Sequence, residues 1–208
     1  MTTISFPELA RDSETSIEAA IAKRRSRRSF AESPLETSAL AALLWAAQGI
    51  TDEKGGIAFR TAPSAGATHP LKIFLEVPTD GAEDVSGGLY HYEPEDHELT
   101  TVVEKPIREA LVAAAFNQDV VRDAAATIAI AANYDTTVRE YPDHGRRYVH
   151  MEAGHAAQNV QLVCESLDLS CCPVGAFADD ELHEALSLPT DLDPLYLLPV
   201  GNRTDEGR

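Results

Sequence analysis

The 208-residue sequence contains few cysteines, few aromatic residues and no long apolar run. Its three cysteines, Cys164, Cys171 and Cys172, are an odd number at positions that argue against a disulfide framework, so we expect a reducing compartment. No apolar run reaches the roughly 20 residues that span a bilayer, and the first residues lack the basic start and apolar stretch of a signal peptide. These absences predict a soluble cytoplasmic protein without membrane association.

Several chemistry-bearing motifs are also absent. There is no GxGxxG and no GxxxxGKS or GxxxxGKT, which excludes the common dinucleotide and P-loop fingerprints, and there is no GxSxG nucleophile elbow. The seven histidines form no HExxH, and His150 and His155 are five residues apart, a spacing that does not place them on one helix face. We therefore expect no metal site. Cys171 and Cys172 could be reactive, but buried inert thiols are the commoner case.

The charge balance is strongly acidic, with 34 Asp and Glu against 17 Lys and Arg and a formal net charge of −17. A cationic partner and a hydrated, salt-adapted (halophilic) surface are two explanations. The acidic residues are spread along the whole chain without an acidic tail, which favours the salt-adapted surface. Only one basic cluster is present, so nucleic-acid binding is not expected as the main function.

The pattern of the chain predicts one α+β domain over residues 1–208 with a mixed sheet, because helices and strands interleave and one hairpin argues against a purely parallel arrangement. The longest expected helix, Gly145–Leu169, carries Met151, Val160, Val163 and Leu167 on its apolar face. Gly56–Pro70 is turn-rich and is predicted as a loop. Other expected helices are 16–24, 33–50, 106–116 and 179–188; expected strands are 71–77, 126–133 and 195–201, and 88–102 is expected to form a hairpin.

The stretch "KRRSRRSF", Lys23–Phe30, gathers five of the seventeen cations into six positions. A solvated helix end, where cations suit the helix dipole, explains one or two of them. Like charges this dense repel one another, so a nearby anion would stabilise them. If the segment is extended, Arg24, Ser26 and Arg28 alternate onto one side and form a phosphate cradle of two guanidinium groups and a hydroxyl. The pattern leaves both interpretations open.

Five stretches of the sequence, including the basic one, resemble motifs of a known family. "RRSRRSF" resembles the opening motif of the nitroreductase superfamily, RxSx(R/K)xF. "APSAGATHPL", "GLYHYEPEDHELT", "MEAGHAAQNVQLVCESLDLSCCPVGAF" and "LPVG" are similar, in the same order, to motifs of its SagB/ThcOx-type dehydrogenase branch. The similarity extends from about residue 20 to residue 203. It implies a nitroreductase-like fold, a central mixed or antiparallel sheet flanked by helices, and a homodimer with a long central helix at its interface.

The resemblance also implies an FMN cofactor at the dimer interface, with ligands from both chains. It assigns Arg24, Ser26 and Arg28 to the phosphate and ribityl chain, with Arg25 nearby and Arg203 completing the phosphate site. The loop Pro63, Ser64, Ala65 and Gly66 would reach the flavin of the second chain. The following residues would lie at the ring itself: Asn117 at the pyrimidine edge, where an ordinary helix-ending Asn is the alternative, and Pro173, Val174, Gly175 and Ala176 near N5.

Two departures from the family pattern bear on activity. Many nitroreductases carry a Glu where this chain has Gly175 and Ala176. Azoline-oxidising members carry a Lys-Tyr pair ahead of the long helix, where this chain has Glu140 and Tyr141. We take Glu140 and Tyr141 as candidates for proton transfer, with residues of a surface loop as the alternative. Azole formation is accordingly not predicted.

The resulting hypothesis is an FMN-dependent oxidoreductase with ping-pong half-reactions, acting on a small-molecule or peptide substrate. NAD(P)H is a candidate reductant, because this family stacks nicotinamide on FMN without a Rossmann domain. A flavin-binding or catalytically reduced partner subunit of a peptide-modifying complex is the alternative. A nucleic-acid-binding protein using the arginine cluster is a third hypothesis, which predicts steeply salt-dependent binding.

Overall fold

The computed structural model, which describes residues 2–7, 9 and 12–204, is organised around a seven-stranded sheet. Every strand pair in this sheet is antiparallel. Of the expected mixed or antiparallel sheet, the structure has the antiparallel form, flanked by helices as predicted. The strands in spatial order are β1 (Thr3–Ser5), β6 (Glu98–Val103), β5 (Gly88–Glu93), β4 (Leu71–Val77), β7 (Ala126–Ala132), β9 (Asp193–Asn202) and β8 (Leu169–Cys171).

The central strand β7 explains why the sheet has a core on both faces. All seven of its residues are buried, and alternate side chains point to opposite faces. Ile128 and Ile130 pack into one hydrophobic cluster, whereas Ala129 and Ala131 pack into the other. The continuous apolar run "ATIAIAA" thus fits a strand that is covered on both sides.

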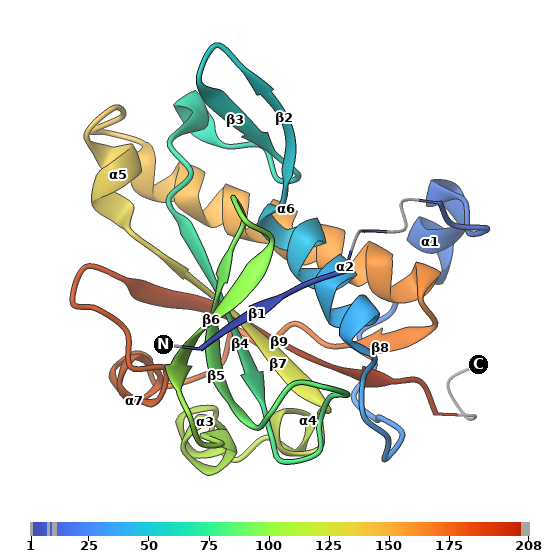
Figure 1. Ribbon diagram of the computed structural model, residues 1–208. Helices are drawn as coiled ribbons and strands as arrows, with labels where there is room; N and C mark the ends of the chain where they lie inside the picture. Colours follow the sequence, from blue (N-terminus) through green and yellow to red (C-terminus); the bar gives the residue numbers. More distant parts are fainter. Residues whose placement is uncertain (1, 8, 10–11, 205–208) are drawn as a thin grey trace.

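Helices cover the two faces in separate groups (Figure 1). The residues of α2 and α6 belong to the first cluster, and those of α3, α4 and α7 belong to the second. The helices are α1 (Ile17–Lys23), α2 (Thr37–Gln48), α3 (Arg108–Ala114), α4 (Asp119–Arg122), α5 (Tyr134–Val138), α6 (Gly145–Ser166) and α7 (Asp179–Ala185).

A two-stranded hairpin of β2 (Ile50–Lys54) and β3 (Ile57–Arg60) projects beyond the main sheet in Figure 1. Strand β3 lies inside the segment Gly56–Pro70 that the sequence predicted as loop. The turn-forming Gly55 and Gly56 have positive φ values of 63° and 78°, which connect the two strands tightly. The remainder of that segment is irregular apart from a short 3₁₀ turn, Ala65–Ala67.

The long helix α6 forms as predicted, but its buried face differs from the prediction. Val160 is buried, whereas Met151 and Leu167 are 51% and 41% exposed. Polar Glu152 and Glu165 are buried instead. The helix packs its small alanines against the sheet and α2, and its buried carboxylates have polar partners on neighbouring elements.

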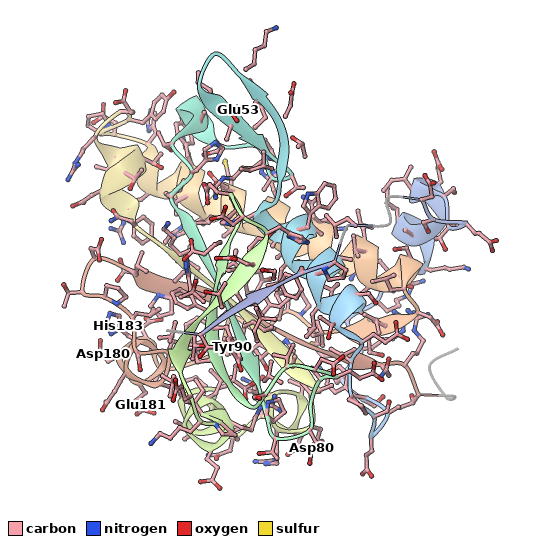
Figure 2. The ribbon with its side chains drawn as sticks, in the orientation of Figure 1. Glu53, Asp80, Tyr90, Asp180, Glu181 and His183 are labelled. Atoms are coloured by element: carbon pink, nitrogen blue, oxygen red, sulfur yellow. The ribbon has the colours of Figure 1, made fainter. Side chains whose placement is uncertain are left out.

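Acidic side chains are distributed over the molecule rather than gathered at one face (Figure 2). Glu53 lies on the projecting hairpin, Asp80 follows β4, and Asp180 and Glu181 lie on α7, all of them exposed. No single acidic patch for one cationic partner is apparent among these residues. Adaptation to high salt stays a prediction from the composition.

A buried ion pair joins the sheet to α3. Glu76 on β4 is fully buried, and both its oxygens accept hydrogen bonds of 3.1 Å from Arg108 Nε. Arg108 Nη2 forms the ion pair at 2.7 Å, while Nη1 donates to the carbonyls of Arg122 and Ala124. One guanidinium group therefore satisfies a buried carboxylate and two loop carbonyls.

Arg108→Met is expected to lower the free energy of unfolding by about 3–5 kcal/mol, because it leaves the Glu76 carboxylate buried without its partner. Urea denaturation with linear extrapolation measures the loss. Arg122→Met is the control, since its pair with Asp119 is exposed and is worth about 1 kcal/mol or less. Equal losses in the two variants would contradict the prediction.

Candidate functional site

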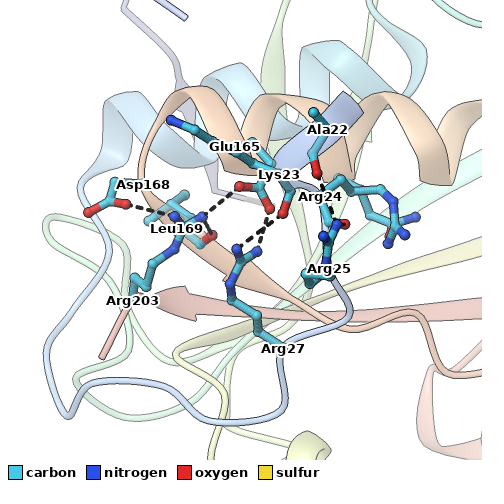
Figure 3. Close-up of polar contacts among 10 residues, drawn as sticks. Ala22, Lys23, Arg24, Arg25, Arg27, Glu165, Asp168, Leu169 and Arg203 are labelled. Carbon is cyan, nitrogen blue, oxygen red and sulfur yellow. Dashed lines mark hydrogen bonds and ion pairs between the residues drawn. The ribbon is translucent and has the colours of Figure 1, made fainter. Parts of the chain in front are cut away.

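The basic segment, Lys23–Arg28, leaves the end of α1 as extended chain and lies along the C-terminal end of α6 (Figure 3). Ser16 caps α1 at its N-terminus by accepting a hydrogen bond from the Ala19 N–H. The Arg27 N–H donates to the Cys171 carbonyl at 3.0 Å. The segment is therefore held between α6 and β8.

Three of the five cations in the basic segment are bound within the chain. Arg24 Nη1 donates to Gln161 Oε1 at 3.1 Å, and Arg27 is ion-paired with Glu165. Arg25 Nη1 caps the end of α1 by donating to the carbonyls of Ala22 and Arg24 at 3.0 and 2.8 Å. These contacts account for much of the cluster without an external anion.

The predicted alternation of Arg24, Ser26 and Arg28 onto one side of the extended segment is only partly observed. Arg24 is half-buried against α6, whereas Ser26 and Arg28 are exposed. Arg24 and Arg28 consequently differ in environment, because the Arg24 guanidinium group is already hydrogen-bonded to Gln161. Within the described residues, no carboxylate lies within ion-pair distance of Arg28. Arg28 and Ser26 are the members of the predicted cradle that remain available to a ligand.

Arg203 is engaged in the same ion-pair network. Its Nη2 lies 3.1 Å from Glu165 Oε2 and its Nη1 lies 2.9 Å from Asp168 Oδ1, and Nη2 also donates to the Leu169 carbonyl at 2.9 Å. Glu165, with 2% of its side chain exposed, thus bridges Arg27 and Arg203 (Figure 3). In this arrangement Arg203 positions the end of β9 against α6 and supports the basic segment indirectly.

The loop Pro173–Ala176 lies next to the basic segment in the folded chain. The Arg27 N–H bond to the Cys171 carbonyl brings Arg28 to the start of this loop. Burial raises the pKa of the Cys172 thiol, and the positive charge of Arg28 acts in the opposite direction. Val174 exchanges backbone hydrogen bonds with Leu197 on β9 at 2.8 and 2.9 Å. Gly175 and Ala176 are exposed, and their N–H groups have no acceptor among the described residues.

Asn117 lies beside the same loop. It ends the turn after α3 with a positive φ of 58°, and its N–H donates to the Val112 carbonyl. The neighbouring Gln118 side chain donates to the Ala176 carbonyl at 2.8 Å. The fold therefore brings Arg28, Asn117 and the loop Pro173–Ala176 along one side of the chain.

The loop Pro63–Gly66 lies elsewhere, against the N-terminal half of α6. Gly66 has φ 62°, and a Cβ at this position would lie 2.9 Å from the Tyr141 hydroxyl oxygen. Ala67 and His69 also have positive φ values, 52° and 46°. His69 is held by its side chain, whose Nε2 lies 3.0 Å from the Ala58 carbonyl. This strained backbone is characteristic of a segment with a positional requirement.

A buried carboxyl group lies under this loop. Glu152 on α6 is 2% exposed, and its partners are the Ser64 hydroxyl and Gln48 Nε2, the latter at 3.4 Å. Ser64 Oγ accepts from the His69 N–H at 2.9 Å. Burial raises the pKa of Glu152 to about 7, against the lowering effect of the Ser64 and Gln48 hydrogen bonds and of the Arg60 charge. The Ser64 side chain is thus directed to the protein interior.

The two candidate regions are separated along α6. Gln161, at the basic segment, and Glu152, at the Pro63–Gly66 loop, are nine positions apart, which corresponds to about 14 Å of helix. One chain therefore does not assemble the complete set of predicted ligands around a single point.

Tyr141 and Glu140 precede α6. Tyr141 is half-buried, contacts the Tyr148 ring edge-on at 5.3 Å between centroids, and lies against Gly66. Glu140 is exposed. Tyr141 is consequently part of the Pro63–Gly66 region, and Glu140 lies at its solvent side.

The structure also contains a cavity of about 590 Å³ that the sequence analysis did not predict. Its wall includes Gly175 of the candidate loop and three α5 and α6 side chains, Tyr134, Arg146 and His150. Tyr134 and His150 are hydrogen-bonded through the hydroxyl oxygen and Nε2. The only sequence signal was the i, i+4 spacing of Arg146 and His150 on the expected helix, which is too common to single out a site.

Glu152→Gln is expected to change the pH dependence of stability. Because the folded-state pKa is raised from 4.5 to about 7, the folded protein holds this proton while the unfolded chain releases it, so wild-type stability falls as pH rises through this window. The variant lacks this contribution. Its free energy of unfolding, measured against wild type by urea denaturation, should gain about 2–3 kcal/mol between pH 5 and pH 8. If the free energies of unfolding of variant and wild type changed in parallel with pH, the raised pKa of Glu152 would be refuted.

Clusters of metal-ligating side chains and membrane-spanning helices are both absent from the described part of the chain. No group of three or more His, Cys, Asp or Glu side chains is arranged to hold a metal ion there. Among the helices of residues 2–7, 9 and 12–204, none combines the length and the apolar character required to cross a bilayer.

Comparisons with known proteins agree with the geometry. Residues 21–202 match the model of the nitroreductase family. A protein of Methanocaldococcus jannaschii whose name places it among the nitroreductases is 42% identical over 205 residues, 97% of each chain. A nitroreductase-like crystal structure from Ralstonia eutropha JMP134 has a TM-score of 0.83 at 28% identity, covering 98% of this chain and 90% of that one.

A structure from Desulfovibrio desulfuricans that contains FMN shares the fold, with a TM-score of 0.65 at 20% identity, covering 94% of this chain and 91% of that one. The family model covers most of the chain, and its boundaries enclose the basic segment, the Pro63–Gly66 loop, α6 and the Pro173–Ala176 loop. The chain belongs to the nitroreductase family.

Proposed function

We propose that this protein is an FMN-dependent oxidoreductase in which Arg28 and Ser26 bind the phosphate of the cofactor. The observation that carries the proposal is the environment of Arg28. It is exposed, it lacks a carboxylate partner within the described residues, and it follows Arg27, whose N–H is hydrogen-bonded to the Cys171 carbonyl just before the loop Pro173–Ala176. A free guanidinium group next to an exposed hydroxyl suits a phosphate dianion.

The residues present fit the rest of this cofactor as well. The Gly175 and Ala176 N–H groups are available donors and can face the polar edge of the flavin ring near N5. Asn117, beside them, supplies an amide suited to the pyrimidine edge. Arg24 and Arg25 support the segment through Gln161 and the carbonyls of α1, and Arg203 supports it through Glu165. When bound, FMN supplies hydride transfer at N5.

We further propose a homodimer in which the Pro63–Gly66 loop of one chain completes the flavin site of the other. The separation of these regions within one chain supports this arrangement. The exposed side of α6 between them carries Met151 and Gly154, and nothing lies within 4 Å of a Cβ built on Gly154. A mid-helix glycine costs about 1 kcal/mol relative to alanine, and close approach of a second helix would account for it.

The finer assignment to the SagB/ThcOx-type dehydrogenase branch rests on the motifs in the sequence. In this proposal Tyr141 holds the Pro63–Gly66 loop and can provide a proton, with Glu140 beside it, while NAD(P)H is the candidate reductant and a small molecule or peptide is the substrate. Ping-pong kinetics follow if donor and acceptor use one site in turn. Turnover by the isolated protein separates an enzyme from a flavin-binding partner subunit of a peptide-modifying complex. The three cysteines are free and buried, which is consistent with the proposed cytoplasmic location.

The visible spectrum of the purified protein tests the cofactor directly. We expect flavin bands and release of FMN on denaturation. Arg28→Glu should weaken FMN binding by about 10- to 100-fold, because a charge-assisted hydrogen bond of about 1.5–3 kcal/mol is lost. Fluorescence titration of the cofactor-free protein with FMN measures the dissociation constant.

Lys105→Glu is the matched control, because it makes the same charge change at an exposed position outside the candidate site. Circular dichroism establishes that both variants are folded. A protein that is colourless and does not bind added FMN would overturn the proposal, and unchanged FMN affinity in Arg28→Glu would overturn the role of Arg28.

Gly154→Leu is expected to convert the dimer into folded monomers, because a side chain at the closest approach of two helices keeps them apart. Light scattering coupled to size exclusion gives the mass, and the thermal midpoint reports on folding. Gln158→Leu, one turn further along the exposed side, distinguishes a steric effect at Gly154 from an added apolar surface. A wild-type protein that is monomeric at micromolar concentration would refute the dimer.

A further inference from the structure

We infer that Tyr134 and His150 form a proton relay to an acceptor bound in the 590 Å³ cavity next to Gly175, an inference that rests on the proposed flavin chemistry. Both residues line the cavity, and neither belongs to the predicted proton-transfer pair, Glu140 and Tyr141. The cavity is large enough for a small organic acceptor. Its Gly175 wall is continuous with the loop proposed to lie at the flavin N5 edge.

The environments of the two side chains differ in the way that a relay requires. Tyr134 is 7% exposed, so its hydroxyl group is shielded from bulk water, whereas His150 is exposed. The rings meet edge-on, with centroids 5.5 Å apart and an interplanar angle of 85°, and the hydroxyl bonds to Nε2. A proton can pass from solvent to the imidazole and then to the phenol without water entering the site.

The charges around Tyr134 come from three elements. Arg146 on α6 lies over its ring with Cζ 3.9 Å from the centroid, and Asp193 on β9 and Asp179 on α7 line the same cavity. Burial raises the pKa of Tyr134, Arg146 acts to lower it, and the two aspartates act to raise it. The phenol is therefore protonated at neutral pH, and Arg146 stabilises the phenolate that proton transfer produces.

The step can be balanced with a quinone as acceptor. Bound reduced FMN would supply a hydride, with its two electrons, to one quinone oxygen, and the negative charge would then lie on the second oxygen. That oxygen takes the proton of the Tyr134 hydroxyl, Tyr134 regains a proton from Nε2 of His150, and His150 regains one from solvent at Nδ1. One hydride and one proton thus convert the quinone to the hydroquinone, and the cofactor is left oxidised by two electrons.

Rapid mixing of the reduced flavoprotein with two oxidants, only one of which needs a proton, measures how much the Tyr134 proton contributes to the oxidation rate. Duroquinone needs a proton on its oxygen, whereas ferricyanide takes electrons singly and needs none. Tyr134→Phe should slow oxidation by duroquinone by about 100-fold and reduce its solvent isotope effect, because a general acid has been removed. Oxidation by ferricyanide should keep its wild-type rate. His150→Gln, whose amide can donate the hydrogen bond to the Tyr134 oxygen but cannot relay a proton, should show the same selective loss.

Tyr90→Phe is the matched control, because it removes a β5 hydroxyl that donates to the Ser86 carbonyl (Figure 2), and Tyr90 is not among the residues that line the cavity. It should leave both oxidation rates unchanged. Equal slowing with both oxidants in Tyr134→Phe would indicate a structural role for Tyr134 and overturn the relay, as would full duroquinone activity in that variant.

A second readout uses the cofactor-free protein and does not depend on activity. The nitrogen NMR spectrum of neutral His150 should show a protonated Nε2 that donates to the Tyr134 oxygen, and Tyr134→Phe should shift that resonance. An unprotonated Nε2 in neutral His150 would direct the Tyr134 proton to the imidazole instead of the acceptor and overturn the relay. If the protein binds no FMN, the proposed function fails, whereas a flavin-loaded Tyr134→Phe with normal duroquinone oxidation refutes the relay alone.

Discussion

The geometry of the candidate site depends on one buried carboxylate, Glu165, near the end of α6. It is shared by Arg27 of the basic segment and Arg203 at the end of β9, so three parts of the chain that are distant in sequence meet at one charge. Removing a buried carboxylate from water is costly unless it is fully paired, and two guanidinium groups provide that pairing. With Arg27 held, the segment is fixed as extended chain and Arg28 is left at the surface beside the Pro173–Ala176 loop.

This network changes how the basic cluster should be interpreted. A dense group of cations in an acidic protein suggests an external anion, yet most of these cations satisfy groups of the chain itself. The internal contacts and the proposed phosphate contact are complementary, because the paired arginines supply the rigidity that an exposed guanidinium group needs for a defined position. A cluster of like charge can therefore contain both structural and ligand-binding members.

Helix α6 connects the other features. Its C-terminal half holds the basic segment, its N-terminal half places Glu152 under the Pro63–Gly66 loop, and its side facing the cavity carries Arg146 and His150. Buried polar groups on a helix are tolerated here because each has a partner on a neighbouring element. A helix that was expected mainly to supply an apolar face thus organises most of the polar chemistry of this protein.

The segments that form β4, β7 and β9, the β5–β6 hairpin, the position of α6 and the membership of the family could be predicted from local patterns, since periodicity and short motifs are properties of contiguous sequence. The pairing of β3 with β2, the burial of Glu152 and Glu165, and the exposure of Met151 could not, because each depends on what packs opposite. By itself the sequence determined that Lys23–Arg28 is a dense cationic segment and that Tyr134 follows a buried strand. Only the tertiary structure decided which arginine remains unpaired and that Tyr134 meets His150, because ion pairs and hydrogen bonds between distant residues arise from packing and are not encoded in residue spacing.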